Sequence, residues 1–197
     1  MDLQQTQTLY NLARSFAGES QAGNRYCLYA EKAQSEGSYA LAALLREIAR
    51  NEEAHAKVFL EHLTQGMPEP IDNLPFNAGY PYIFASTLEN IEAAARAEQE
   101  EFTEIYPNFS AIATQEGFSS IAASFDRIAA VEHAHHDILT QAAQQMRSQT
   151  LYAGAQPSVW RCSHCGHSAV LTAAWSRCPL CGYPQGYVEL HITAPTY

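Results

Sequence analysis

Apolar residues recur every three or four positions along four segments of the chain, and this spacing predicts four helices. In the second segment the apolar stripe runs through Leu41, Leu45 and Ile48, and then continues through Glu52 and His55. A carboxylate and an imidazole therefore occupy positions where a buried apolar residue is expected. We predict helices over about residues 3–35, 39–65, from Ser86 or Thr87 to a break at Gly117, and 118–147.

The other predicted helices carry the same kind of interruption. Each half of the chain has a helix with one core-facing Glu, followed at almost the same spacing by a helix with Glu-x-x-His. A buried charge without a partner is very costly, so a compensating group is needed inside. This repeat matches the carboxylate-bridged two-metal sites of ferritin-like bundles. The predicted ligands are Glu19, Glu52, His55, Glu98, Glu132 and His135.

The helical periodicity does not decide whether two further side chains, Glu101 and His136, bind the metal. Glu101 follows Glu98 by three residues, so it is either a further ligand or a solvated acid beside Glu100. His136 lies one turn from Glu132 and could also reach the site. The second helix has alanine at the position equivalent to His136, which favours His135 as the ligand. A single Glu assigned to the core face of a helix more often lies on an exposed face. Four glutamates and two histidines on four matching stripes are hard to obtain by chance.

Prolines and glycines dominate residues 66–82 and exclude a helix there. A long connection between the second and third of four helices is the topology of ferritin-like folds. Pro107 predicts a kink or restart in the third helix. The predicted fold is an all-α ferritin-like four-helix bundle with a long crossover between helices 2 and 3.

Four of the five cysteines form two CxxC pairs near the C-terminus. This spacing predicts a tetrahedral metal site rather than disulfides, and it leaves iron and zinc both open. We expect a bundle domain over 1–149, a linker over 150–158 and a small metal-knuckle domain over 159–197, which is too short for a core without a metal. The remaining cysteine, Cys27, is interpreted as a packed thiol. The predicted tail ligands are Cys162, Cys165, Cys178 and Cys181.

Charge and composition exclude several classes of partner. The net charge of −10 argues against a nucleic-acid surface or an anionic membrane. We find no signal-peptide pattern and no apolar run long enough for a membrane helix, so we expect a cytoplasmic protein. Four carboxylates and two imidazoles suit iron or manganese. Two irons that cycle between ferrous and ferric store the two electrons needed to split a peroxide O–O bond or to reduce dioxygen to peroxide.

These motifs, taken together in this order, resemble those of the rubrerythrin family with its rubredoxin-like tail. The resemblance covers nearly the whole chain. One departure is Gly23, where the family commonly has an arginine, and we expect it to alter a surface or partner contact. The matching stretches are Phe16–Ala22 with Arg25-Tyr26, Glu52–Ala56, Glu98-x-x-Glu101 with Tyr106-Pro107, Glu116–Phe118, Glu132-x-x-His135, Trp160–Gly166 and Cys178–Cys181.

The resemblance implies a non-haem di-iron site in the bundle and one iron in an Fe(Cys)4 tail. It implies reduction of hydrogen peroxide to water in oxidative-stress defence. Electrons would come ultimately from NAD(P)H through separate redox proteins and would pass through the tail. It favours Glu101 as a ligand that exchanges with His55 as the redox state changes. It also implies that Tyr26 and Tyr106 orient ligand carboxylates by hydrogen bonding, and that the protein forms a head-to-tail homodimer.

Two other functions remain open from the sequence. One is iron handling, in which a ferroxidase or an oxygen-reducing di-iron protein oxidises Fe(II) and releases it to a mineral. The other is a zinc-ribbon interaction protein whose bundle metal is only structural. Metal content and visible spectra separate these from a peroxidase, because zinc is colourless and would carry no electrons.

Overall fold

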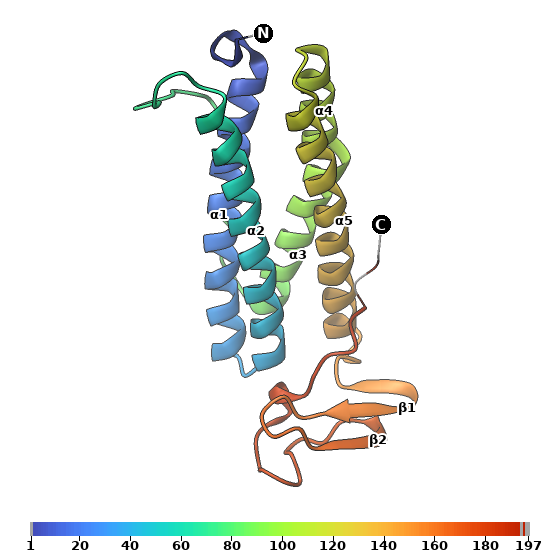
Figure 1. Cartoon of the computed structure of the whole chain (residues 1–197). Coiled ribbons are helices and arrows are strands. Elements are labelled where there is room, and N and C mark those ends of the chain that lie inside the picture. The colour runs from blue at the N-terminus through green and yellow to red at the C-terminus, as the bar shows by residue number, and fades with distance from the viewer. Residues whose placement is uncertain (1, 194, 196–197) are drawn as a thin grey trace.

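Five α-helices make up the bundle in the computed structural model, which describes residues 2–193 and 195. After a 3-10 turn (Leu3–Gln5) these are α1 (Gln7–Ser35), α2 (Tyr39–Gln65), α3 (Thr87–Glu100), α4 (Tyr106–Gln115) and α5 (Ser119–Arg147). α1 pairs with α2, while α3 and α4 follow one another along α5 (Figure 1). The predicted ferritin-like bundle is confirmed, with α3 and α4 together forming its third helix. The outer limits of the predicted domains, residues 1 and 197, lie outside the described residues.

The two helical hairpins end their first helices in the same way. Gly37 and Gly117 both adopt positive φ, 83° and 82°, a conformation that glycine reaches without steric cost. The next amide then reaches back to the helix: Ser38 N–H donates to Ala33 O and Phe118 N–H to Ala113 O, both at 2.8 Å. The repeat seen in the sequence is therefore also a repeat of backbone structure.

A π turn over Glu101–Ile105 joins α3 to α4, so the third helix changes its winding just before Pro107, where a kink or restart was predicted. The amide of Tyr106 donates to the carbonyl of Glu101. Pro107 sits in the first turn of α4, where a missing N–H costs little. In an α-helix, residues five apart point about 140° apart, whereas a π turn brings them closer to one face. Glu101 and Tyr106 can therefore both face the bundle interior.

The crossover, residues 66–86, contains no helix or strand and is fastened along α1. Arg14 Nε donates to Asn77 O at 3.2 Å, and Tyr80 Oη donates to Arg14 O at 2.9 Å. Further along, Tyr29 Oη donates to Ile83 O at 2.6 Å. These bonds to backbone carbonyls hold the segment against one side of the bundle along much of the length of α1.

The apolar core consists of two clusters, one toward each end of the bundle. The cluster nearer the tail includes Leu41, Leu45 and Ile91, and the other is built around Phe59 and Phe125. The predicted ligands lie between the two clusters along the helices. Gly23, which we expected at a surface contact, is instead buried: a Cβ there would lie 3.2 Å from the Ala49 carbonyl oxygen. The expectation was wrong because the α1–α2 contact has no room for a longer side chain.

The tail is an antiparallel hairpin of β1 (Ala153–Arg161) and β2 (Ser168–Ala173), followed by a short 3-10 turn (Gln185–Tyr187). The linker predicted over 150–158 was wrong for residues 153–158, which are part of β1. Its glycine and proline suggested a loop, but a two-stranded sheet has only edge strands, and these tolerate both residues. Pairing is irregular between Ala153 and Ser158, where Gly154 and Pro157 lie.

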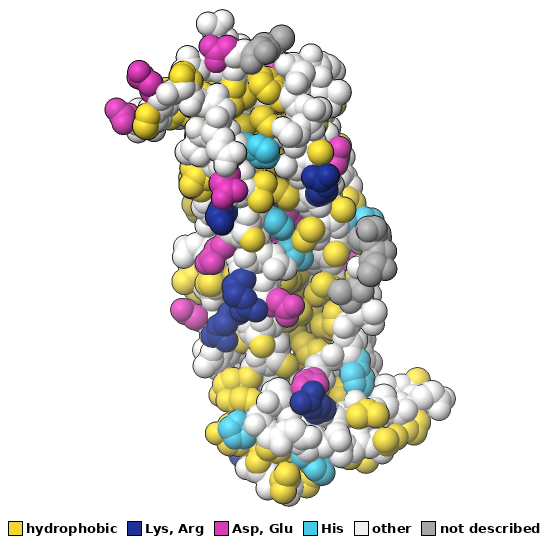
Figure 2. All heavy atoms as spheres, viewed as in Figure 1, with side chains coloured by type: hydrophobic (Ala, Val, Ile, Leu, Met, Phe, Trp, Pro, Cys, Tyr) yellow, Lys and Arg dark blue, Asp and Glu magenta, His cyan; other side chains and the backbone are white. Residues whose placement is uncertain are grey.

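The tail lies against the end of the bundle at which α1 turns into α2 (Figure 1). Gly186 lies directly on the carbonyl of Gly37, a contact that no side chain at this position would permit. The ring of Tyr187 stacks on that of Tyr39 with centroids 4.1 Å apart. Figure 2 shows apolar side chains above the tail, where a cavity of about 660 Å³ opens between α2, α5 and the tail.

Among the described residues, we find no helix that is both long and apolar enough to cross a membrane.

Candidate metal centres

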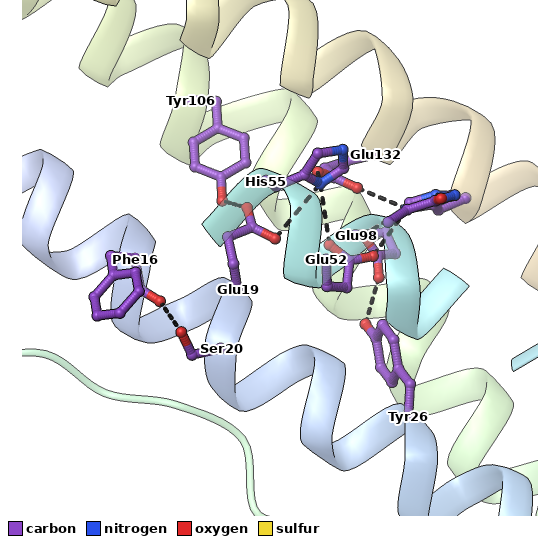
Figure 3. A network of polar contacts seen from close by, with 11 residues as sticks. Phe16, Glu19, Ser20, Tyr26, Glu52, His55, Glu98, Tyr106 and Glu132 are labelled. Atoms are coloured by element: carbon purple, nitrogen blue, oxygen red, sulfur yellow. Dashed lines mark hydrogen bonds and ion pairs between the residues drawn. The ribbon is translucent and has the colours of Figure 1, made fainter. Parts of the chain in front are cut away.

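The six predicted bundle ligands come from α1, α2, α3 and α5 and meet in one buried cluster (Figure 3). The helical period places each of them on the inner face, in line with the apolar stripe of its own helix. None is more than 9% exposed to solvent. Charged and polar groups at this depth need a strongly compensating partner. The residues in question are Glu19, Glu52, His55, Glu98, Glu132 and His135.

Glu52 and Glu132 are shared between two groups of potential ligands. For Glu132, Oε1 lies 2.8 Å from His55 Nδ1 and Oε2 lies 2.7 Å from His135 Nδ1. For Glu52, Oε2 lies 3.2 Å from His55 Nδ1 and Oε1 lies 3.0 Å from His135 Nδ1. Each carboxylate thus turns one oxygen to each histidine, which is the arrangement of a carboxylate that bridges two ions.

The other two glutamates each belong to one half of the cluster. Glu19 joins the His55 half and Glu98 joins the His135 half. Tyr106 Oη donates to Glu19 Oε1, and Tyr26 Oη donates to Glu98 Oε1 (Figure 3). Each tyrosine fixes one carboxylate oxygen and leaves the other directed toward the centre of the cluster, as the outer partners of metal ligands commonly do.

The residues present fit two metal ions. In each half, ligand atoms from four side chains lie within 4.8 Å of one another. Several buried ligand atoms have no hydrogen-bond partner within the described part of the chain, although buried polar groups are almost always paired. A cation in each half would satisfy them. The atoms without a hydrogen bond, several of which face one another at the ion-pair distances given above, are Glu19 Oε2, Glu52 Oε1, Glu98 Oε2, both carboxylate oxygens of Glu132, and His135 Nδ1.

The electrostatics of the metal-free cluster show how crowded these charges are. Burial raises the pKa of Glu19, and the charge of Glu132 raises it further. Burial likewise raises the pKa of Glu98, together with the charge of Glu52. Burial opposes protonation of His135, but contacts with Glu132 and Glu52 prevail and raise its pKa to about 11. Without metal, protons take the place of the cations that the cluster is built to hold.

Asn51 is a further site residue that sequence reasoning missed. Its Nδ2 lies 3.1 Å from His135 Nε2. With the amide oxygen turned toward the ring, Asn51 would accept the Nε2 proton and leave the Nδ1 lone pair free for a metal. Asn51 directly precedes Glu52, but one amide beside a ligand carries no distinctive sequence signal.

Glu101 does not join the two groups of ligands. It lies at the start of the π turn and is partly buried, and this burial together with the charge of Glu98 raises its pKa. His136 is turned away, because its Nδ1 lies 2.8 Å from Ala95 O. In this arrangement His55, and not Glu101, lies among the potential ligands. The exchange of these two residues with the redox state stays a prediction.

The four cysteines of the tail form a second centre. Sγ of Cys162 lies 3.8 Å from Sγ of Cys181, and Sγ of Cys165 lies 3.7 Å from Sγ of Cys178. These distances are too long for disulfides. Four sulfurs bound tetrahedrally at about 2.3 Å would lie about 3.8 Å apart, so the site fits a metal. The two knuckles match in backbone structure, since Gly166 N–H donates to Cys162 O and Gly182 N–H to Cys178 O, both at 2.8 Å.

The comparisons with known proteins agree with this geometry. The family model described as Rubrerythrin matches residues 10–143. Rubrerythrin-1 of Clostridium acetobutylicum is 37% identical over 188 residues, covering 95% of this chain and 96% of the relative. Rubrerythrin of Porphyromonas gingivalis is 38% identical over 184 residues, covering 93% of this chain and 90% of the relative. The match therefore includes both the bundle and the tail.

Solved structures show the same fold. A mixed-valence nigerythrin covers 97% of this chain and 94% of its own, with a TM-score of 0.63 at 22% identity. A bacterioferritin of Mycobacterium tuberculosis covers 72% of this chain and 87% of its own, with a TM-score of 0.62 at 22% identity. With a carboxylate–histidine centre for two irons and a four-cysteine site for a third, the chain belongs to the rubrerythrin family.

Proposed function

We propose that this protein reduces hydrogen peroxide to water at its di-iron centre, as part of defence against oxidative stress. Two electrons would reach the centre through the Fe(Cys)4 site of the tail. The residues to which we assign the di-iron chemistry are Glu19, Glu52, His55, Glu98, Glu101, Glu132 and His135, and we assign the tail iron to Cys162, Cys165, Cys178 and Cys181.

The observation that carries this proposal is the position of Glu101 relative to the shared carboxylates. Glu52 and Glu132 belong to both ligand groups, so they would hold two ions side by side. Glu101 lies near them and is partly buried, with its pKa raised by burial and by the charges of the neighbouring glutamates. A carboxyl group whose pKa is raised is better suited to act as a general acid.

The di-iron centre, when bound, supplies the two electrons that cleave the O–O bond. The chain's own residues do the rest. Glu101 would hold a proton on its carboxyl group and give it to the departing oxygen. Tyr26 and Tyr106 orient Glu98 and Glu19 through their hydroxyl groups. The burial of the six inner ligands keeps bulk water away from the centre, which strengthens each electrostatic contact.

The four-cysteine site lies at the end of its own bundle, because the amide of Ser163, next to Cys162, donates to Tyr187 O. Tyr187 of the tail packs on Tyr39, and Glu52 lies thirteen positions further along α2, which is about 20 Å by helical rise. We propose a head-to-tail homodimer, in which the tail of one subunit serves the centre of the other. We further propose that separate NAD(P)H-linked redox proteins reduce the tail, and that a reducing cytoplasm keeps its thiolates available.

Peroxide turnover by iron-loaded Glu101→Gln tests this proposal. We expect its kcat for hydrogen peroxide to fall about 100-fold, because the amide cannot donate the carboxyl proton. The matched control is Glu104→Gln, which changes an exposed acid in the same π turn and should retain full turnover. Unchanged peroxide turnover in Glu101→Gln would show that our role for Glu101 is wrong.

Dioxygen as the comparison oxidant tests the reaction itself. If the protein is a peroxidase, hydrogen peroxide should oxidise the reduced protein faster than dioxygen does at equal concentration. The protein should also keep its iron. Faster oxidation by dioxygen, with iron released to a mineral, would instead identify an iron-handling protein.

A further inference from the structure

A cavity of about 680 Å³ lies between α1, α3 and the crossover, on the Glu101 side of the bundle. The crossover forms one wall and is the thin trace beside α1 in Figure 3. Tyr80 contributes to this wall and is held in place by its hydrogen bond to Arg14 O. A Cβ at Gly18 would lie 3.4 Å from the Tyr80 ring, so the missing side chain helps to keep this space open.

The inner end of the cavity lies beside the candidate metal centre, although none of the six inner ligands lines it. Glu101 and Tyr106 both line it, and the hydroxyl of Tyr106 donates to Glu19. The carboxylates of both ligand groups are at most 1% exposed, whereas Glu101 is only partly buried and lines the cavity. A small molecule in this cavity can therefore touch Glu101 without any movement of the bundle.

The cavity is much larger than hydrogen peroxide requires. A water molecule occupies about 30 Å³ in the liquid, and hydrogen peroxide adds only one oxygen atom. Sites of about 300 to 1,000 Å³ typically enclose organic ligands. The space therefore has room for a peroxide that carries an organic substituent.

The lining combines apolar surface with positive charge. Ile83 and Phe109 contribute apolar side chains, while Arg14, Arg25 and Arg96 contribute guanidinium groups. The lining also includes Glu100 and Glu101, so the three arginines leave it with a small positive net charge in a chain whose overall charge is −10. Guanidinium groups bind carboxylates well, and apolar side chains favour a hydrocarbon chain.

We infer that this cavity is a substrate site for organic hydroperoxides that carry a carboxylate, such as fatty-acid hydroperoxides. The inference rests on the proposed peroxidase function and extends its substrate class. The reaction is ROOH + 2 e⁻ + 2 H⁺ → ROH + H₂O. The O–O bond breaks and the peroxide is reduced by two electrons, which the di-iron centre would supply when bound. One oxygen leaves as the alcohol ROH and the other as water.

Gly18→Leu narrows the cavity beside Tyr80, and leucine is a better helix former than glycine, so the helix should be preserved. With the iron-loaded full-length protein, linoleic acid hydroperoxide should be reduced with a kcat/KM within about tenfold of that for hydrogen peroxide. Gly18→Leu should lower the ratio of these two values at least tenfold. Ser20→Leu adds the same side chain at an exposed position on α1 and should leave the ratio unchanged.

Arg96→Gln tests whether a guanidinium group at the cavity binds the carboxylate of the substrate. It should weaken turnover of the free-acid hydroperoxide at least fivefold relative to that of its methyl ester. Arg127→Gln, which removes an exposed arginine from α5, is the control. An equal effect on acid and ester would overturn the assigned carboxylate contact.

Binding provides a readout that does not depend on turnover. The product alcohol, the hydroxy fatty acid, should bind the oxidised protein in calorimetry, and Gly18→Leu should raise its Kd at least tenfold. Absence of both binding and hydroperoxide turnover, in protein that still reduces hydrogen peroxide, would overturn this inference alone. If the wild-type protein does not reduce hydrogen peroxide at all, the proposed function itself would be overturned.

Discussion

Glu52 and Glu132 face each other from α2 and α5, and each turns one carboxylate oxygen toward His55 and the other toward His135. Glu19 and Glu98, by contrast, each belong to a single half of the cluster. This difference between shared and unshared carboxylates leads directly to a test by metal content.

Glu132→Gln should remove most of the iron from both positions, because the neutral amide replaces a ligand common to both. Glu19→Gln should affect mainly the His55 half and leave about one iron per bundle. Iron per protein, measured by elemental analysis together with the tail spectrum, distinguishes these outcomes. Glu53→Gln, an exposed neighbour of Glu52, serves as the control. Full di-iron occupancy in Glu132→Gln would contradict the shared role.

Tyr106→Phe removes the hydroxyl that holds Glu19 while keeping the packed ring. We expect iron affinity in the His55 half to fall about 10- to 100-fold, as is typical when an outer partner of a metal ligand is lost. Competition with a chelator measures this change. Tyr10→Phe alters a partly exposed tyrosine of α1 outside the cluster and should have no effect. Equal affinities in wild type and Tyr106→Phe would show that the hydroxyl does not position Glu19.

The metal-free protein should lose stability as pH rises from about 5 to 8. Burial and neighbouring acids raise the pKa values of Glu19, Glu98 and Glu101 above 4.5, so the folded state keeps protons that the unfolded state releases. His135, with its pKa raised above 6.5, contributes stability at low pH that is likewise lost as pH rises. The lowered pKa of Glu52 changes nothing in this range, because its contribution is complete above 4.5.

Urea unfolding of the chelated protein at several pH values measures this dependence. We expect the free energy of unfolding to fall by at least about 2 kcal/mol between the two ends of the range. Iron-loaded protein should not show this decline, because the cations replace the protons. A metal-free protein that is equally stable or more stable at the higher pH would contradict the raised pKa values.

Cys178→Ser removes one buried ligand from the tail centre. The Fe(Cys)4 absorption should disappear, while the di-iron centre should persist in a bundle that has its own apolar clusters. Peroxide turnover should fail with a protein electron donor and survive with a small chemical reductant. The control is Cys27→Ser, at a partly buried cysteine packed against the core of the bundle. It should change neither the Fe(Cys)4 absorption nor the peroxide turnover. Normal turnover with the protein donor would exclude the tail as the electron route.

Much of the site could be predicted because helical periodicity is a local property. Glu52 and His55 stand out in a stripe with Leu45 and Ile48. The same Glu-x-x-His pattern recurs at Glu132 and His135, which argues against an accidental match. Glycine and proline marked the helix ends and the crossover for an equally local reason. The strand at 153–158 was missed because its backbone bonds join it to a distant partner, and composition alone resembled a loop.

The sequence by itself thus determined which side chains lie on inner helix faces, and that two cysteine pairs could share a metal. Only the tertiary structure decided which oxygen each carboxylate offers, that Glu52 and Glu132 are shared, and that Tyr26 and Tyr106 hold Glu98 and Glu19. It also decided that a π turn brings Glu101 to the edge of an open cavity. These features depend on distances between helices and on side-chain rotation, which packing of the whole bundle sets and no local pattern encodes.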